Sequence, residues 1–154
     1  MDSTGQMKEK LAASIFEVLE KMFFVFLEPA AGRGSSEGLS ADIGFRGPAC
    51  GRLEMFSSPG VSRTMVRNML NIEDGEVTEA MLQDGLKEAV NMICGNFLRK
   101  HDPSRVFDLQ IPSFHGAGEF RGRRDPAAGE EIAVELAFAA DGETLGVVLF
   151  LDRL

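Results

Sequence analysis

The sequence is poor in the residues on which several kinds of functional site depend. It contains no tryptophan and no tyrosine, and only two cysteines and two histidines among 154 residues. His101 and His115 have no metal-ligand spacing with Cys50 or Cys94. A glycine-rich phosphate loop of the Walker or dinucleotide type is also missing. We therefore expect this chain to bind no metal and no cofactor by itself.

Positive charge and long apolar runs are scarce as well. The formal net charge of −8 argues against a nucleic-acid ligand and against an anionic membrane surface, because both need a basic face. The N-terminus lacks the features of a secretory signal, and the apolar run 22–27 is far too short to span a bilayer. We expect a cytoplasmic protein with reduced thiols, whose partners are proteins rather than membranes or nucleic acids.

What is present predicts a single α+β domain over residues 1–154, with residues 1–6 as a disordered tail. The composition, 44% hydrophobic and 26% charged, is that of a folded globule. Periodicity predicts helices over 7–27, 59–70 and 79–100, and strands over 39–46, 50–56, 106–111, 119–121, 132–138 and 145–151. Separate blocks of helices and hairpins favour an antiparallel β-sheet with long α-helices packed on it. The apolar strand at the C-terminal end is expected to be paired on both sides rather than to form a bare edge.

One polar pattern on the long helix is the main functional candidate. At about 100° per residue, the pattern Asp84-x-x-x-Glu88-x-x-Asn91 and Gly95 share one ridge opposite the apolar stripe. Solvation alone would explain polar residues on a helix surface. Two details favour a site. Asparagine in a helix interior is roughly 0.5 kcal/mol less favourable for helix formation than alanine, so Asn91 calls for another reason to be there. Methionines also flank the ridge, Met92 among them, and adaptable apolar surface of that kind suits a protein partner.

This pattern, joined to Gly95-Asn96 and followed by Pro112, resembles the active-site signature of the CheC/CheX/FliY chemotaxis phosphatases. Members with two sites repeat the motif on the first helix. Here that helix offers Glu17 but has Glu20 where an asparagine is needed, so the chain is closest to the single-site CheX branch. The spacing to Pro112 is slightly shorter than the family pattern, which leaves the role of this proline open.

The resemblance implies a phosphatase that hydrolyses the aspartyl phosphate of a CheY-type response regulator receiver. In that reading Asn91 orients the attacking water, and Glu88 pairs with a lysine of the receiver. Asp84 and Met92 contribute partner contacts, and Gly95 lets the partner backbone approach. Mg²⁺ and the lysine are supplied by the receiver. The resemblance also implies a homodimer paired through the sheets.

Two alternatives remain open at this point. The domain could be a non-catalytic module that docks a receiver in a signalling complex, or an unrelated α+β domain in which the motif arose by chance. Asn91 favours the enzyme, because a docking surface alone does not require an amide that disfavours the helix.

Overall fold

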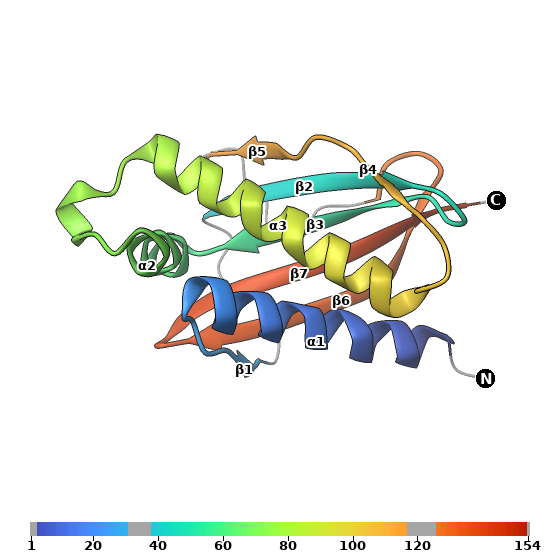
Figure 1. Ribbon diagram of the computed structural model, residues 1–154, viewed down its shortest axis with the longest axis horizontal. Helices are drawn as coiled ribbons and strands as arrows, with labels where there is room; N and C mark the ends of the chain where they lie inside the picture. Colours follow the sequence, from blue (N-terminus) through green and yellow to red (C-terminus); the bar gives the residue numbers. More distant parts are fainter. Residues whose placement is uncertain (1–2, 31–37, 117–125, 154) are drawn as a thin grey trace.

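The computed structural model describes residues 3–30, 38–116 and 126–153, which form helices packed on one antiparallel sheet (Figure 1). The elements are, in chain order, α1 (Ser3–Phe23), β1 (Glu28–Pro29), β2 (Leu39–Arg46), β3 (Gly51–Ser57), α2 (Pro59–Leu70), the 3-10 helix η1 (Asp74–Glu76), α3 (Glu79–His101), β4 (Asp108–Leu109), β5 (Ser113–His115), β6 (Glu130–Ala140) and β7 (Glu143–Asp152). This arrangement confirms the expected α+β class.

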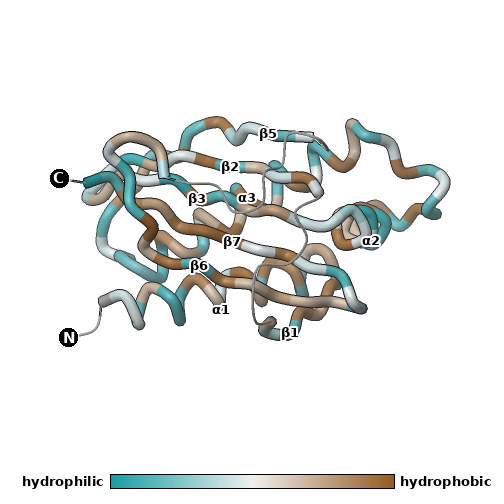
Figure 2. Tube along the Cα trace, turned by 180° about the vertical axis from the view of Figure 1, so that it is seen from behind, coloured by the Kyte–Doolittle hydropathy of each residue, from teal (hydrophilic) through white to brown (hydrophobic). Residues whose placement is uncertain are grey.

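The sheet has the order β1-β6-β7-β3-β2-β4, with β5 also paired to β2. All of its described pairings are antiparallel. The apolar strand β7 lies between β3 and β6 along almost its full length, as expected from the sequence. Seen from behind, hydrophobic residues follow β7 through the sheet (Figure 2). Most side chains of β7 are therefore buried within this chain.

The hydrophobic core lies between the sheet and the two long helices. Helices α1 and α3 run side by side across one face of the sheet, and α2 packs at one end (Figure 1). The largest fully buried side chains come from both layers: Phe23, Phe45, Phe97, Phe150, Leu11, Ile15, Leu19, Ile43, Leu53, Met55, Met65 and Leu86. Burial of each such side chain contributes about 1.5–3 kcal/mol relative to exposure. This core holds α3 rigidly with one face outward.

The first helix begins and ends earlier than the periodicity indicates. It starts at Ser3, so the expectation of a disordered tail over 1–6 is wrong for residues 3–6. It ends at Phe23 because Phe24 adopts a positive φ of 53°, and the N–H of Val25 donates to the carbonyl of Leu19 at 2.8 Å. This bond gives a partner to one of the carbonyl groups that the end of the helix would otherwise leave unpaired.

Beyond the end of α1, buried and exposed side chains alternate at every second residue, as in an extended chain. Val25 and Leu27 are buried, whereas Phe24 and Phe26 are 60% and 70% exposed. A helix over 7–27 would place Phe26 on its inward stripe, and this is wrong because the helical period stops at Phe23. Met22 belongs to the same predicted stripe and lies within α1, but it is 42% exposed.

The segment after α3 differs from the single strand expected over 106–111. Only Asp108–Leu109 pairs with β2, and Ser113–His115 pairs with it again further along. Pro112 stands between the two pieces and has no N–H to donate to a ladder. The strand expected over 119–121 lies outside the described residues.

Candidate functional site

The candidate site lies on α3, whose ends and buried face are strongly specified. The Thr78 hydroxyl accepts a hydrogen bond from the backbone N–H of Met81 at 3.2 Å, which caps the first turn. Basic residues occupy the last turn, where they complement the helix dipole. The buried stripe consists of Leu86, Ala89, Val90, Ile93, Cys94, Phe97 and Leu98, with Gly85 beside it. The helix expected over 79–100 is thus confirmed.

The polar residues of the motif lie on the opposite, outward face of α3. Asp84 and Glu88 are exposed, while Asn91 and Gly95 are half-buried. Within the described ranges, the side chains of Asp84, Glu88 and Asn91 make no hydrogen bond and no ion pair. Their donors and acceptors are therefore not used by the fold and remain available to a partner.

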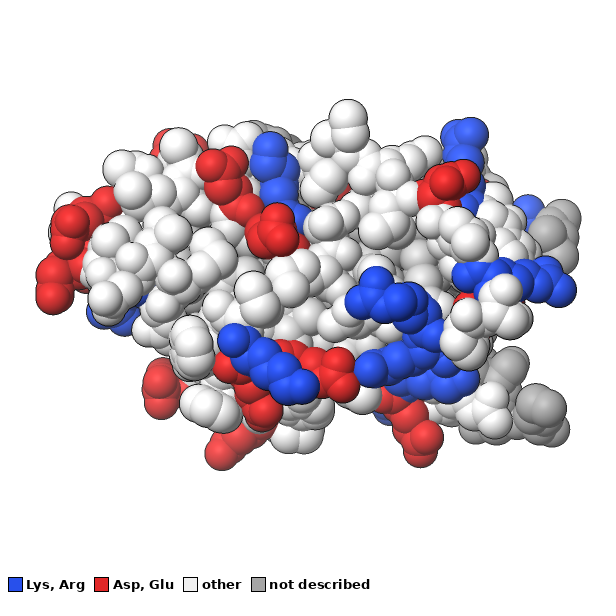
Figure 3. Space-filling view, in the orientation of Figure 1, with Lys and Arg blue, Asp and Glu red and all other residues white. Residues whose placement is uncertain are grey.

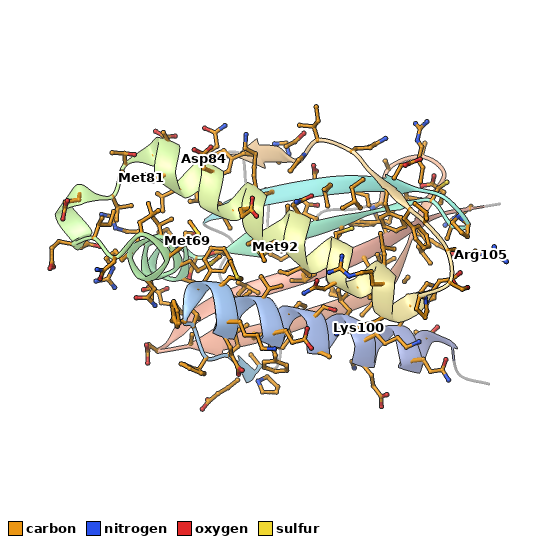
Figure 4. The ribbon with its side chains drawn as sticks, in the orientation of Figure 1. Met69, Met81, Asp84, Met92, Lys100 and Arg105 are labelled. Carbon is orange, nitrogen blue, oxygen red and sulfur yellow. The ribbon has the colours of Figure 1, made fainter. Side chains whose placement is uncertain are left out.

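Met92 belongs partly to the fold. It is half-buried and packs against the hydrophobic core, on the side of α3 toward α1 (Figure 4). Asp84 lies one to two turns from the start of the same helix, at its outer surface (Figure 4). Only the part of Met92 that remains exposed can contribute to a contact surface next to the ridge.

Gly95 and Gly85 differ in how much space surrounds the position that a side chain would occupy. A Cβ on Gly95 would lie 3.6 Å from Arg99 Nη1 and 3.8 Å from Leu109 Cδ1, both ordinary contacts. A Cβ on Gly85 would lie only 2.9 Å from Val66 Cγ2. Packing within the chain therefore explains the glycine at 85 and does not explain the one at 95.

Arg99 is a residue of this surface that the motif does not include. It is exposed, its Nη2 donates to Oδ1 of Asn96, and its guanidinium lies next to Gly95. The signal in the sequence was the continuation of the i, i+4 series 91, 95, 99 along one helix face.

The first helix carries a structural ion pair where a second motif would stand. Lys100 Nζ lies 3.1 Å from Glu17 Oε1, which ties α3 to α1. Glu17 is therefore more than a solvated residue on the surface of α1. A half-buried ion pair of this kind contributes about 1 kcal/mol or less, so it orients the helices more than it stabilises them.

Other ionisable groups in the described residues are not arranged as a catalytic or metal site. No group of three or more His, Cys, Asp or Glu among them could hold a metal ion. Burial raises the pKa of the Cys94 thiol to about 12, which keeps it protonated and unreactive at neutral pH. No helix in the described part of the chain has the length and apolar character needed to cross a membrane.

A charged cluster occurs on the sheet, away from α3. Arg52 lies 4.1 Å over the ring of Phe150 and pairs with Glu130 at 2.9 Å and Glu54 at 3.0 Å. The hydrogen bond from Arg52 lowers the pKa of Glu130 below its ordinary value. Because these charges are paired with one another, the cluster links β3 to β6 and has a structural role.

The comparisons with known proteins agree with the fold and identify a family. A family model described as chemotaxis phosphatase CheX matches residues 39–136, a range that contains all of α3. None of the curated proteins matches the chain.

Several solved structures share the fold at low sequence identity. A chemotaxis protein CheX from Vibrio vulnificus is 21% identical with a TM-score of 0.78, covering 97% of this chain and 98% of that one. The matching chain of a CheX–CheY–BeF3–Mg²⁺ complex from Borrelia burgdorferi is 21% identical with a TM-score of 0.72, covering 94% and 97%. FliY from Thermotoga maritima is 11% identical with a TM-score of 0.64, covering 96% and 89%.

Proposed function

Because the chain belongs to the CheX family of chemotaxis phosphatases, we propose that it hydrolyses the aspartyl phosphate of a CheY-type receiver domain. The observation that carries this proposal is the carboxamide of Asn91. It is half-buried, unpaired within the described residues, and held between Glu88 and Gly95 on the outward ridge of a rigid helix.

The chemistry needs little from this chain. An acyl phosphate is already activated, so the remaining task is to place a water in line with the leaving oxygen and to stabilise the spreading charge. The Asn91 carboxamide can accept from that water and donate to a phosphoryl oxygen at the same time. The water oxygen bonds to phosphorus as the phosphorus–oxygen bond to the aspartate breaks, which releases inorganic phosphate and the free carboxylate.

The other motif residues would hold the receiver in place. Glu88, exposed and unpaired, would bond to a receiver lysine in a charge-assisted contact. Asp84 would make a peripheral polar contact, and the exposed part of Met92 would add apolar area. Gly95 would let the partner backbone come close to the helix.

The metal would come from the partner. Asp84 and Glu88 are only two carboxylates on the ridge, and the described residues offer no larger cluster, so they do not fit a resident Mg²⁺ site. The complex from Borrelia burgdorferi pairs CheX with CheY, BeF3 and Mg²⁺ and supports a receiver as the partner. Such a partner would also place this protein in the cytoplasm.

The proposal is tested by loss of phosphate from a labelled receiver with substoichiometric amounts of this protein. The wild-type chain should accelerate the loss catalytically. Asn91→Ala should reduce the rate by about 100-fold or more, as removal of a transition-state donor does elsewhere. It should still bind the receiver loaded with Mg²⁺ and beryllofluoride. Undiminished decay with Asn91→Ala would reject the assignment, and a wild-type chain that binds without turnover would identify a docking module.

We also propose a homodimer, on the strength of the family membership. The apolar C-terminal strand β7 is paired on both sides within the single chain. Light scattering coupled to size exclusion should report twice the chain mass of 16.7 kDa. A monomeric mass at micromolar concentration would contradict this proposal.

A further inference from the structure

Arg99 lies on the same helical ridge as the motif. At about 100° per residue, positions 84, 88, 91, 95 and 99 fall within roughly 80° of one another on α3. The Cα atoms of Asn91 and Arg99 are separated by about 12 Å along the helix axis. Helical side chains lean toward the N-terminus, and Nη1 of Arg99 lies next to Gly95. The guanidinium charge of Arg99 is therefore only about one helical turn from Asn91.

The guanidinium is held in that place by its neighbours. Nη2 donates to Oδ1 of Asn96, and the missing side chain of Gly95 leaves the helix surface free beside Nη1. A cation that is already oriented loses less conformational freedom on binding than a freely rotating one.

Arg99 also differs from the other basic residues near this end of α3. Lys100 is paired with Glu17, and Arg105 lies 3.8 Å from Asp102. In the described part of the chain, Arg99 has no carboxylate partner. Its charge is exposed and uncompensated, so it is available to an anion outside the chain.

The balance of charge changes along α3. Asp84 and Glu88 lie in its N-terminal half together with one basic residue, Lys87, whereas its last turn is basic. Blue side chains gather over the C-terminal part of the helix (Figure 3). Glu88 and Arg99 are about 16 Å apart along the axis, with Asn91 between them. A phosphorylated receiver is anionic at its phosphate, so a chain of net charge −8 would repel it without a local cation at the contact.

We propose that Arg99 is a positioning residue that contacts an anionic group of the receiver beside its phosphoryl site, and that Arg99 and Glu88 together fix the orientation of the receiver on α3. The inference rests on the proposed phosphatase function. Only one orientation places a receiver lysine against Glu88 and a receiver anion against Arg99, which brings the phosphate to Asn91.

The effect belongs to binding rather than to the chemical step. Charges at the rim of an interface act mainly on the association rate and on its salt dependence. Arg99→Gln should raise KM for the phosphorylated receiver about 3- to 10-fold at low salt and change kcat less than about 2-fold. Arg99→Lys should restore part of the loss, because it keeps the charge but loses the planar fork.

The experiment compares Arg99→Gln with the matched control Arg105→Gln, which removes the same charge beyond the end of α3 (Figure 4). KM and kcat are measured between about 25 and 300 mM NaCl, and binding is measured with the receiver loaded with Mg²⁺ and beryllofluoride. We expect weaker binding and a flatter salt dependence for Arg99→Gln, and wild-type behaviour for Arg105→Gln. Far-UV circular dichroism verifies that both variants are folded.

The outcomes separate the two proposals. An active wild type, an inactive Asn91→Ala and an unchanged KM in Arg99→Gln would overturn the role of Arg99 alone. Equal losses in Arg99→Gln and Arg105→Gln would also overturn it, because they would show a general charge effect. A wild-type chain that neither binds nor dephosphorylates the receiver would overturn both proposals.

Discussion

Gly85 of α3 faces Val66 of α2 so closely that a Cβ on the glycine would lie 2.9 Å from Val66 Cγ2. Val66 is 1% exposed and β-branched, so its methyl group has little freedom to move aside. The two helices therefore meet where one of them has no side chain. This contact places the N-terminal half of α3, and with it the motif, relative to the rest of the domain.

Gly85→Ala should therefore destabilise the protein. Overpacking costs about 1–3 kcal/mol, and the better helix propensity of alanine returns at most about 1 kcal/mol. We expect the free energy of unfolding in urea to fall by about 1 kcal/mol. A Gly85→Ala variant as stable as the wild type would show that α2 shifts without cost.

Gly95→Ala should have the opposite effect on stability and a harmful one on function. Its Cβ meets only ordinary contacts, so helix propensity should raise the free energy of unfolding by about 0.5–1 kcal/mol. If a receiver backbone approaches the helix there, the added methyl group should weaken binding and turnover. Urea titration and receiver-phosphate decay measure the two effects on the same preparation. Full activity in the stabilised variant would remove Gly95 from the proposed interface.

Glu88→Gln should weaken both binding and turnover. It keeps the size and helix propensity of the side chain but removes the charge that would pair with the receiver lysine. Loss of a charge-assisted hydrogen bond costs about 1.5–3 kcal/mol, which corresponds to roughly 10- to 150-fold in kcat/KM. Asp84→Asn, one turn away on the same ridge, serves as the control and should lose much less. Equal effects at both positions would indicate a general loss of negative charge instead of a specific pair.

The stability of the protein should fall at alkaline pH because of Cys94. Burial raises the pKa of this thiol to about 12 in the folded state, whereas the unfolded chain releases the proton near an ordinary cysteine pKa of about 8.5–9. The stabilisation is complete below about pH 8.5 and is lost as the pH rises from there toward 12. At pH 10 the loss should be about 1–2 kcal/mol.

The measurement compares urea unfolding of the wild type and Cys94→Ala at pH 8 and pH 10. The alanine variant is less stable overall because it leaves a cavity, but its stability should depend less on pH. Parallel pH dependences for the two proteins would refute the role of this thiol.

The helix α3 was predicted almost to the residue, because its signals are local. The cap at Thr78, the apolar period and Pro103 beyond the end all lie within or next to the segment itself. The outward ridge followed from the same period. The end of α1 was missed because the positive φ of Phe24, a bulky residue, is unfavourable on local grounds. Burial of Val25 and Leu27 in the core overrides that preference.

The strands after α3 were harder to predict for a related reason. β4 and β5 exist only as partners of β2, which lies more than sixty residues earlier in the chain. Neither piece is long enough to carry an alternating pattern of its own. A short edge strand is defined by the neighbour that it pairs with, and a local pattern cannot identify that neighbour.

The sequence by itself determined the long helix, its buried stripe, and the presence of Asp84, Glu88 and Asn91 on one outward ridge, because helical geometry converts spacing directly into direction. Only the tertiary structure decided that Gly85 is needed by the fold while Gly95 is left open. Two glycines on one helix look alike in sequence, and what surrounds them depends on elements distant in the chain. The free charge of Arg99 was decided in the same way, since an ion pair depends on which carboxylates the packed helices bring within reach.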